Sequence, residues 1–346
     1  MHRSGQDENW LIRKIRRDLA SGAAGELPRL KVGIGDDAAL WRPSPGQEVV
    51  LTCDWFLEAV HFRRDTHPAD AVGWKCLARA VSDIAAMGAR PRCFLLSLAL
   101  PESHTGEWLD SFLAGLRRAS RKFRCPPAGG DTTRSEKILI NVTAIGEVRK
   151  AALRSGARVD DLICVSGRLG EAQLGLELLL RRRSTAGQNR QALEKHLYPR
   201  PRLEQARQLV ESGFVTAMID LSDGLSTDLK RLCRASGVGA TIQQSRLPLA
   251  KPLAQQTVRH EELLRAALHG GDDYELLFTV PRRNLKRLPR KIAGVLLTVI
   301  GQVQKGNQIF LAPPNGRRVP LRIAGWDPFR RTTKNSQKFA SQNGSG

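Results

Sequence analysis

Acidic residues recur beside glycines along this chain, and this pattern constrains the fold more than any other feature. The first group is the Gly-Ile-Gly-Asp-Asp turn at 33–37, and related Gly-Asp motifs return at 129–131 and 270–273. Further acids that follow or interrupt apolar runs are Asp54, Asp83, Asp220 and Asp223. Glycine allows a tight turn and a close approach of backbone N–H groups to a ligand. Acidic turns of one style, far apart in the chain, predict a site built between several elements.

Composition limits the class of protein. A chain of 346 residues suggests two domains, and a hydrophobic content of 41% is enough for two cores. The 55 Lys and Arg residues exceed the 34 Asp and Glu residues, which raises the question of nucleic acid. Most of the excess is Arg spread along the chain, without alternating aromatic residues. We interpret it as a solvated basic surface and do not expect a nucleic-acid partner; general attraction of small anions is the other interpretation.

Cysteine spacing and the apolar runs predict the cellular setting. The six cysteines show no CxxC spacing and mostly lie in apolar runs, which is typical of reduced core residues in the cytoplasm. The N-terminus has no segment like a signal peptide, and no run of eighteen apolar residues occurs. We therefore expect a soluble cytoplasmic protein without a membrane partner.

Periodicity predicts an α+β chain with mixed sheets in two domains. Helices are predicted at 7–20, 70–88, 105–123, 170–183, 203–212 and 260–268, with another starting at 225. Strands are predicted at 49–53, 58–62, 94–100, 138–148, 162–166, 215–219 and 276–280, with two more in 296–312. Polar loops are predicted at 129–134 and 184–190. The expected domains are 1–148 and 149–330, followed by a basic flexible tail at 331–346.

The predicted helix at 70–88 is apolar on nearly all sides, so we expect it to be buried. Asp83 lies in this helix, and a buried lone carboxylate costs several kcal/mol unless it is paired or ligates a metal. A salt bridge to Lys75 or Arg79 is one interpretation. Metal ligation is our preferred one, because the other acids need a common centre.

The motifs that are missing narrow the chemistry. The sequence has no P-loop, no strand–GxGxxG–helix unit, no protein-kinase catalytic loop, no GxSxG elbow and no histidine pair at metal-ligand spacing. What remains is a set of Asp residues at the ends of strands and turns. Mg²⁺ prefers oxygen ligands and is often shared between one or two carboxylates and substrate phosphates. Phosphoryl transfer needs in-line positioning and neutralisation of charge, and several metal ions held by several acids would supply both.

Six motifs in order resemble the thiamine-monophosphate kinase family. They are Gly-Asp-Asp-Ala-Ala at 35–39, Asp54 with Val-His-Phe at 60–62, Ser-Asp-Ile-Ala-Ala-Met-Gly-Ala at 82–89, Gly-Gly-Asp-Thr-Thr-Arg at 129–134, Ile-Asp-Leu-Ser-Asp-Gly-Leu at 219–225 and Gly-Gly-Asp-Asp-Tyr-Glu at 270–275. The resemblance covers about 32–326. It implies the two-domain fold of aminoimidazole ribonucleotide synthetase, with an N-terminal sheet domain that dimerises and a C-terminal α/β domain.

The resemblance also implies an activity and its cofactors. ATP would phosphorylate thiamine phosphate to thiamine diphosphate by direct in-line transfer of the γ-phosphoryl group, with several Mg²⁺ ions. The protein would be a homodimer, with the active site near the interface of the N-terminal domains. Within the superfamily, selenophosphate synthetase would require a reactive Cys before Val32, and none is present. Another ATP-using relative, or a phosphate-ligand binding protein without turnover, is the alternative.

Carried over residue by residue, the resemblance assigns roles to a set of positions. The implied metal ligands are Asp37, Asp54, Asp83, Asp131, Asp220 and Asp223, with the backbone carbonyl of Thr52 as a further candidate. The implied contacts to the ATP phosphates are Gly130, Asp131, Arg154 and Ser222. The implied substrate contacts are His61, Asp272 and Trp326, although His61 as an ordinary strand residue and Trp326 as a packing residue are alternatives. Asp131 and Asp220 are the implied catalytic residues, and Asp36 is expected to shape its turn.

The sequence departs from the family pattern at three positions that carry no carboxylate. These positions are Cys53, where a hydroxyl residue is usual, Ala59 in place of Gly, and Ala80 in place of Asn. The departures leave the expected activity in place and affect the expected metal geometry.

Overall fold

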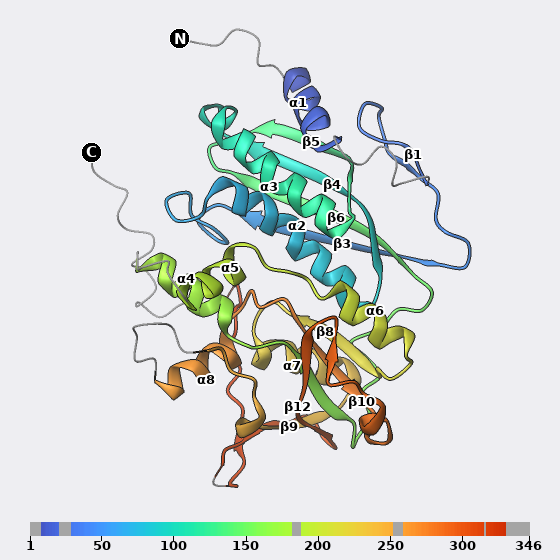
Figure 1. Ribbon diagram of the computed structural model, residues 1–346, viewed down its shortest axis with the longest axis vertical. Coiled ribbons are helices and arrows are strands. Elements are labelled where there is room, and N and C mark those ends of the chain that lie inside the picture. Colours follow the sequence, from blue (N-terminus) through green and yellow to red (C-terminus); the bar gives the residue numbers. More distant parts are fainter. Residues whose placement is uncertain (1–7, 21–28, 182–187, 252–258, 315, 330–346) are drawn as a thin grey trace.

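The computed structural model describes residues 8–20, 29–181, 188–251, 259–314 and 316–329. These form two large sheets, a separate pair of short strands, and helices between and around the sheets (Figure 1). The first sheet has the order β3-β6-β4-β5. Its strands are β3 (Glu48–Leu57), β4 (Arg90–Leu100), β5 (Pro127–Arg134) and β6 (Leu139–Val148). Before it lie α1 (Glu8–Ala20) and the short strands β1 (Leu30–Val32) and β2 (Leu40–Trp41).

Helices α2 (Ala69–Ala86) and α3 (Glu107–Phe123) lie side by side across one face of this sheet (Figure 1). Two glycines allow them to pack closely. A Cβ atom at Gly73 would lie 2.0 Å from the carbonyl oxygen of Phe112, and one at Gly115 would lie 1.9 Å from that of Asp70. Each helix therefore needs a glycine where the backbone of the other passes.

The opposite face of the first sheet is partly uncovered. Strand β3 alternates: Val50 and Phe56 point into the core, whereas Val49, Leu51 and Trp55 are 43%, 67% and 54% exposed. Alternation in a strand directs successive side chains to opposite faces. The outer face of β3 therefore carries apolar side chains that this chain leaves exposed.

The second sheet follows in the order β14-β13-β9-β12-β7-β10-β8, with β11 paired to β12. Its strands are β7 (Leu162–Ser166), β8 (Ala217–Leu221), β9 (Gly239–Gln243), β10 (Glu275–Val280), β11 (Lys291–Ile292), β12 (Val295–Gln304), β13 (Ile309–Ala312) and β14 (Val319–Pro320). The helices around it are α4 (Glu171–Leu180), α5 (Gln188–Leu197), α6 (Leu203–Glu211), α7 (Leu225–Ser236) and α8 (His260–His269). All residues of β7, β8 and β10 are buried, although β8 is the last strand of the sheet, and strands covered on both faces are apolar throughout.

Several predicted elements are wrong, and each has a physical reason. Residues 58–62 form a turn and not a strand: Ala59 has a φ of 65°, and its N–H donates to the Phe62 carbonyl at 2.8 Å. Residues 129–134 belong to strand β5 and not to a loop, because parallel pairing with β4 satisfies their backbone groups. Helix α5 and strand β9 were not predicted, and residues 188–190, expected in a loop, begin α5. The expected tail at 331–346 lies outside the described residues.

The described residues contain no helix long and apolar enough to cross a membrane. The six cysteines are all free, five of them are buried, and Cys53 is exposed. The prediction that the cysteines lie in the core without disulfides therefore agrees with the structure for five of the six.

A buried ion cluster joins β10 to two helices of the second domain. Glu275 is fully buried, and Ser166 Oγ and Arg202 Nε donate to one of its oxygens at 2.5 and 2.6 Å. Lys195 of α5 pairs with the other oxygen. Although burial alone would raise it, Lys195 and Arg202 hold the pKa of Glu275 at about 2.

We predict that Glu275→Gln lowers the free energy of unfolding by about 3 to 5 kcal/mol at neutral pH, because it leaves the two largely buried cations Lys195 and Arg202 without their carboxylate partner. The contribution of a carboxylate with a lowered pKa is complete above its unfolded-state pKa of 4.5 and is lost as pH falls toward 2. Urea unfolding at about pH 7 and about pH 3.5 should therefore show a smaller difference between variant and wild type in acid. An equal difference at both pH values would contradict this account.

Candidate active site between the two domains

Helix α2 presents a polar stripe to the second domain. The stripe starts at Lys75 and continues four, seven and eight positions later with Arg79, Ser82 and Asp83. This spacing places all of them on one side of an otherwise apolar helix. The rest of α2 packs against the first sheet and α3. The stripe faces β8 and the turn at 270–275, to which its side chains bond.

Three carboxylates approach one another from three elements. Asp83 of α2 accepts a hydrogen bond from the Thr52 hydroxyl of β3 at 2.6 Å, and Asp220 of β8 accepts one from Ser82 Oγ at 2.8 Å. Asp220 is only 2% exposed. Burial, followed by the charge of Asp83, raises its pKa well above the usual value.

Asp54 on β3 belongs to the same group. Burial raises its pKa to about 6, and the charges of Asp83 and Asp223 act in the same direction. Arg79 opposes this shift without cancelling it. Asp54, Asp83 and Asp220 therefore form a region of negative charge that the surrounding side chains compensate only partly, and bound cations would compensate it further.

The donor chemistry of this region suits Mg²⁺. Among the described residues, however, no group of three acidic, His or Cys side chains is arranged to hold a metal ion by itself. Mg²⁺ commonly takes one or two carboxylates and completes its octahedron with water and phosphate oxygens. The residues fit an ion that arrives with a polyphosphate better than a closed structural metal site.

The salt-bridge interpretation of Asp83 finds no support in the described contacts. Lys75 Nζ donates to Asp272 Oδ2 at 2.8 Å, and Arg79 lies 3.6 Å from Asp272 Oδ1. Both cations of the stripe therefore turn to Asp272 and leave Asp83 with Thr52 as its recorded partner. Although burial would raise it, Lys75, His196 and Arg79 hold the pKa of Asp272 well below its usual range.

The turn at 270–275 is fixed against the β8–α7 connection. The N–H groups of Asp272 and Tyr274 donate to the carbonyls of Ser222 and Leu221 at 2.8 and 2.9 Å. Asp272 and Tyr274 adopt φ values of 66° and 48°, a conformation that non-glycine residues rarely take and that is frequent at functional sites. Predicted site residues 222, 223 and 272 thus lie together.

His61 and Trp326 lie beside this group, with ring centroids 6.5 Å apart. His61 Nδ1 accepts the Leu57 N–H at 3.0 Å, and burial lowers the pKa of His61 to about 4, so it is neutral at physiological pH. The backbone N–H of Trp326 donates to the backbone carbonyl of Asp223 at 2.9 Å, whereas the residue remains 46% exposed. This exposure argues against a core packing role for Trp326.

Other predicted site residues lie away from the carboxylate group. Across the sheet, Asp131 pairs with Ser97, Ser97 with Asn141, and Asn141 with Trp55. Paired residues point to the same face, so the Asp131 side chain lies on the outer face with Trp55. Thr52 and Asp54 point to the other face. Three strand spacings, roughly 14 Å, separate β5 from β3. Packing alone requires a glycine at the neighbouring position 130, because a Cβ atom there would lie 1.9 Å from the Leu96 carbonyl oxygen.

Asp37 and Arg154 are exposed, and no recorded contact joins either to Asp54, Asp83 or Asp220. Asp36 Oδ1 accepts the Asp37 N–H at 2.9 Å, which agrees with the expectation that Asp36 shapes the turn. The Arg154 carbonyl accepts a bond from Ser236 Oγ at 3.0 Å.

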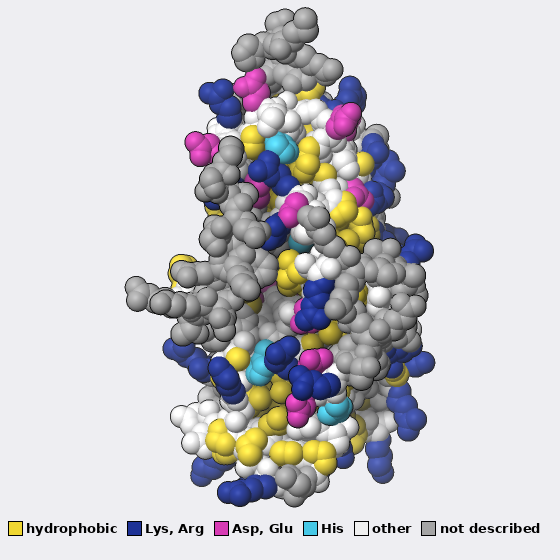
Figure 2. Space-filling model, turned by 90° about the vertical axis from the view of Figure 1, so that its left-hand side faces the viewer, with side chains coloured by type: hydrophobic (Ala, Val, Ile, Leu, Met, Phe, Trp, Pro, Cys, Tyr) yellow, Lys and Arg dark blue, Asp and Glu magenta, His cyan; other side chains and the backbone are white. Residues whose placement is uncertain are grey.

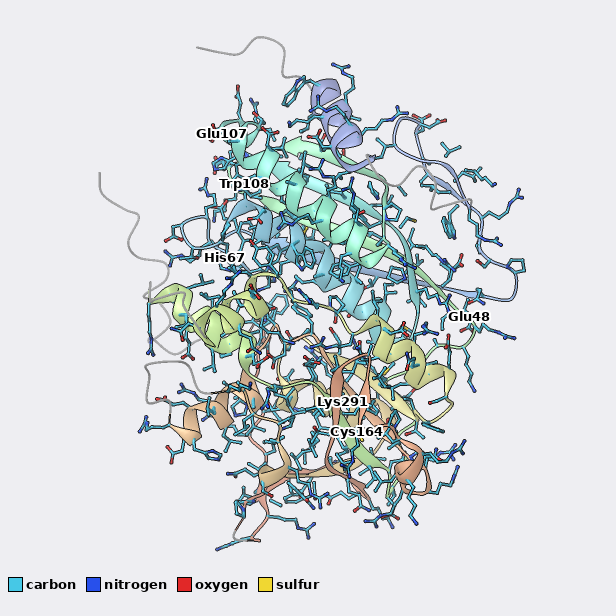
Figure 3. All side chains as sticks on the ribbon, in the orientation of Figure 1. Glu48, His67, Glu107, Trp108, Cys164 and Lys291 are labelled. Atoms are coloured by element: carbon cyan, nitrogen blue, oxygen red, sulfur yellow. The ribbon has the colours of Figure 1, made fainter. Side chains whose placement is uncertain are left out.

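Sequence reasoning missed two sets of residues. Lys75 and Arg79 were considered only as partners of Asp83, although their helical spacing from Asp83 indicates a shared face. A buried pair of histidines was missed entirely: His67, labelled in Figure 3, lies beside α5, where its Nε2 is 3.1 Å from that of His196. Lys75 Nζ lies 3.4 Å from the His196 ring, so these groups link Asp272 and His196 of the second domain to Lys75 and His67 of the first.

Comparisons with known proteins identify the family of this chain. Residues 35–148 match the family model for the AIR synthase related protein N-terminal domain, and residues 158–312 match that for the C-terminal domain. Thiamine-monophosphate kinases from Aquifex aeolicus and Escherichia coli K12 are each 36% identical to this chain, over 86% and 87% of it and 92% of each relative.

Solved structures give the same result. The thiamine-monophosphate kinase from Stenotrophomonas maltophilia has a TM-score of 0.77 and 33% identity, over 87% of this chain and 95% of its own. The Aquifex aeolicus enzyme in complex with AMPPCP and TMP has a TM-score of 0.73 and 33% identity, over 92% and 96%. Hydrogenase maturation protein HypE, at 19% identity and a TM-score of 0.71, shares the fold alone. On this basis the chain belongs to the thiamine-monophosphate kinase family and has its two-domain AIR synthase-like fold.

Proposed function

We propose that this protein transfers the γ-phosphoryl group of ATP directly to thiamine phosphate, forming thiamine diphosphate. The observation that carries the proposal is the convergence of Asp54, Asp83 and Asp220 from three elements, in a chain whose relatives are named thiamine-monophosphate kinases. The Aquifex aeolicus relative binds an ATP analogue and TMP in its solved structure, which supports the same pair of substrates here.

The side chains suggest how the reaction proceeds. An acceptor phosphate is already ionised, so the protein needs no general base and acts by positioning and charge compensation. Several Mg²⁺ ions, when bound, would neutralise the phosphate oxygens. Asp54, Asp83 and Asp220 would hold them, with Asp220 oriented by Ser82. His61, Asp272 and Trp326 would contact the acceptor, and Ser222 would lie near the ATP phosphates.

We also propose that the protein is a homodimer formed through the outer face of the first sheet. Val49, Leu51 and Trp55 expose apolar surface on edge strand β3, and exposed apolar surface of this kind is typical of interfaces. Asp131 lies on the same face, and we propose that in the dimer this carboxylate serves the partner's site. The same reasoning would explain why Asp131 is distant from Asp54 within one chain.

A cytoplasmic location is part of the proposal. Five buried free cysteines and an ATP substrate both suit a reducing compartment. On the face shown in Figure 2, Lys and Arg side chains are dispersed and mixed with acidic ones, which supports a solvated basic surface without a nucleic-acid partner.

Asp220→Asn tests the activity. We expect kcat for thiamine diphosphate formation, measured with ATP, Mg²⁺ and thiamine phosphate, to fall at least about 100-fold, because a charge that holds the reacting groups is lost. We expect the melting temperature of the protein without ligands not to fall, because the substitution removes a buried carboxylate that lacks a cationic partner. Glu275→Gln, which is equally buried but paired, is the matched control and should melt earlier. Normal turnover by Asp220→Asn would contradict the proposal.

Trp55→Glu tests the dimer. A charge placed in an apolar interface is costly to bury, so light scattering should show the mass falling from twice 38.2 kDa to 38.2 kDa. Leu285→Glu, which replaces another exposed apolar residue outside this face, is the control and should leave the mass unchanged. A wild-type mass of 38.2 kDa, or a Trp55→Glu variant with the wild-type mass, would contradict the interface.

Mixed dimers test the placement of Asp131. Asp131→Asn and Asp220→Asn should each be inactive alone. If Asp131 serves its partner's site, dimers that contain one chain of each variant have one intact site and regain up to about half of the wild-type kcat. If mixed dimers remain inactive, Asp131 acts within its own chain.

A further inference from the structure

Arg79 occupies an unusual place in this molecule. Its side chain is 17% exposed and lies on the α2 stripe, 3.6 Å from Asp272 and within reach of the charge of Asp54. Although burial would lower it, Tyr274, Asp272 and Asp54 raise the pKa of Arg79, so its guanidinium stays charged. A fixed cation therefore stands inside a region otherwise dominated by acids.

Contacts on two sides hold the guanidinium still. Arg79 Nη1 donates to the Tyr274 hydroxyl at 3.1 Å, and that hydroxyl donates to Asp272 Oδ1 at 2.7 Å. The guanidinium carbon lies over the Phe56 ring, 5.5 Å from its centre. An arginine fixed in this way has lost its rotational freedom before any ligand arrives, which favours ligand binding.

These contacts use only part of the hydrogen-bonding capacity of the guanidinium. It has five N–H donors, and the one hydrogen bond recorded for it uses Nη1. Arg79 Nε is buried and has no acceptor among the described residues, which is costly and calls for an explanation. Asp272 does not provide one, because at 3.6 Å it is a loose partner and already accepts from Lys75 and Tyr274.

The position of Arg79 matches one part of the substrates. Asp54, a predicted metal ligand, is close enough for its charge to act on Arg79. An aromatic series starts at Phe56, over whose ring the guanidinium lies, and continues with His61 and Trp326 at ring-centroid distances of 5.9 and 6.5 Å, as a surface for an aromatic acceptor. The phosphate of the acceptor must approach the polyphosphate of ATP in this region, where carboxylates repel it. A guanidinium matches phosphate geometry with paired donors better than any other side chain.

We propose that Arg79 binds the phosphate group of the acceptor and makes the site selective for a phosphate monoester over the corresponding alcohol. The proposal rests on the proposed function, because it assumes that this site takes thiamine phosphate. Arg79 is then a specificity-determining residue that contacts substrate directly. Lys75 differs from it, because that amine is fully buried and bonded to Asp272.

Calorimetric titration with thiamine phosphate and with thiamine, without ATP or Mg²⁺, tests this inference. Loss of charge-assisted hydrogen bonds in Arg79→Met should weaken thiamine phosphate binding about 10- to 100-fold and thiamine binding less than about 3-fold. Arg79→Lys should recover part of the loss, because it restores the charge without the paired donors. The KM for thiamine phosphate should rise in the same order.

Arg118→Met is the matched control. Arg118 also pairs with an aspartate, Asp70, at 2.7 Å, and lies over an aromatic ring, that of Tyr198, outside the site. Its removal should leave both affinities unchanged. Thermal unfolding of each variant shows whether the fold is intact, and Arg79→Lys keeps the test available if Arg79→Met does not fold.

The outcomes separate the inference from the proposed function. If Arg79→Met loses affinity for thiamine phosphate and thiamine equally, Arg79 only supports the Asp272 turn. If it loses affinity for neither, Arg79 contacts neither ligand. Either result overturns the inference and leaves the proposed function intact, provided that the wild type forms thiamine diphosphate. A wild type that binds thiamine phosphate no more tightly than thiamine overturns the inference whether or not it turns over. A phosphate preference that depends on Arg79, in a wild type that forms no thiamine diphosphate, supports the inference and contradicts the proposed function.

Discussion

The structure depends on how it accommodates carboxylates that are partly or wholly removed from water. Asp220 and Asp272 both face α2, but they meet opposite partners: a neutral hydroxyl for Asp220 and two cations for Asp272. The first arrangement leaves negative charge to be compensated by something bound, and the second fixes a charge permanently. One helix therefore divides the site into a part suited to metal ions and a part suited to the acceptor.

Much of this could be predicted from the sequence, because the relevant signals are local. The apolar pattern of 70–88 predicted a buried helix, and the acids at 83, 220 and 223 were expected to meet. The pairing of residues 129–134 could not be predicted, since a Gly-Gly-Asp-Thr-Thr segment becomes a strand only when β4 lies alongside it. Likewise, nothing near Asp131 in the sequence indicates that its side chain lies on the outer face of the sheet.

The same distinction applies to the charges. The role of a single Arg in an apolar helix cannot be predicted from the sequence around it, because that role depends on residues almost two hundred positions away. Tyr274 and Asp272 give Arg79 its orientation only after the second domain has folded against α2. Motifs identify residues that many sequences share, whereas contacts between domains decide what an individual side chain such as Arg79 or His196 can do.

The two glycines between α2 and α3 have a consequence beyond close packing. A methyl group at Gly73 or Gly115 would collide with a carbonyl of the facing helix, so α2 fits in one axial position only. Because Lys75, Arg79 and Ser82 belong to the same helix, this close packing also fixes their positions along the helix axis relative to Asp272 and Asp220. Electrostatic alignment on one side of the helix is thus set by the absence of two side chains on the other.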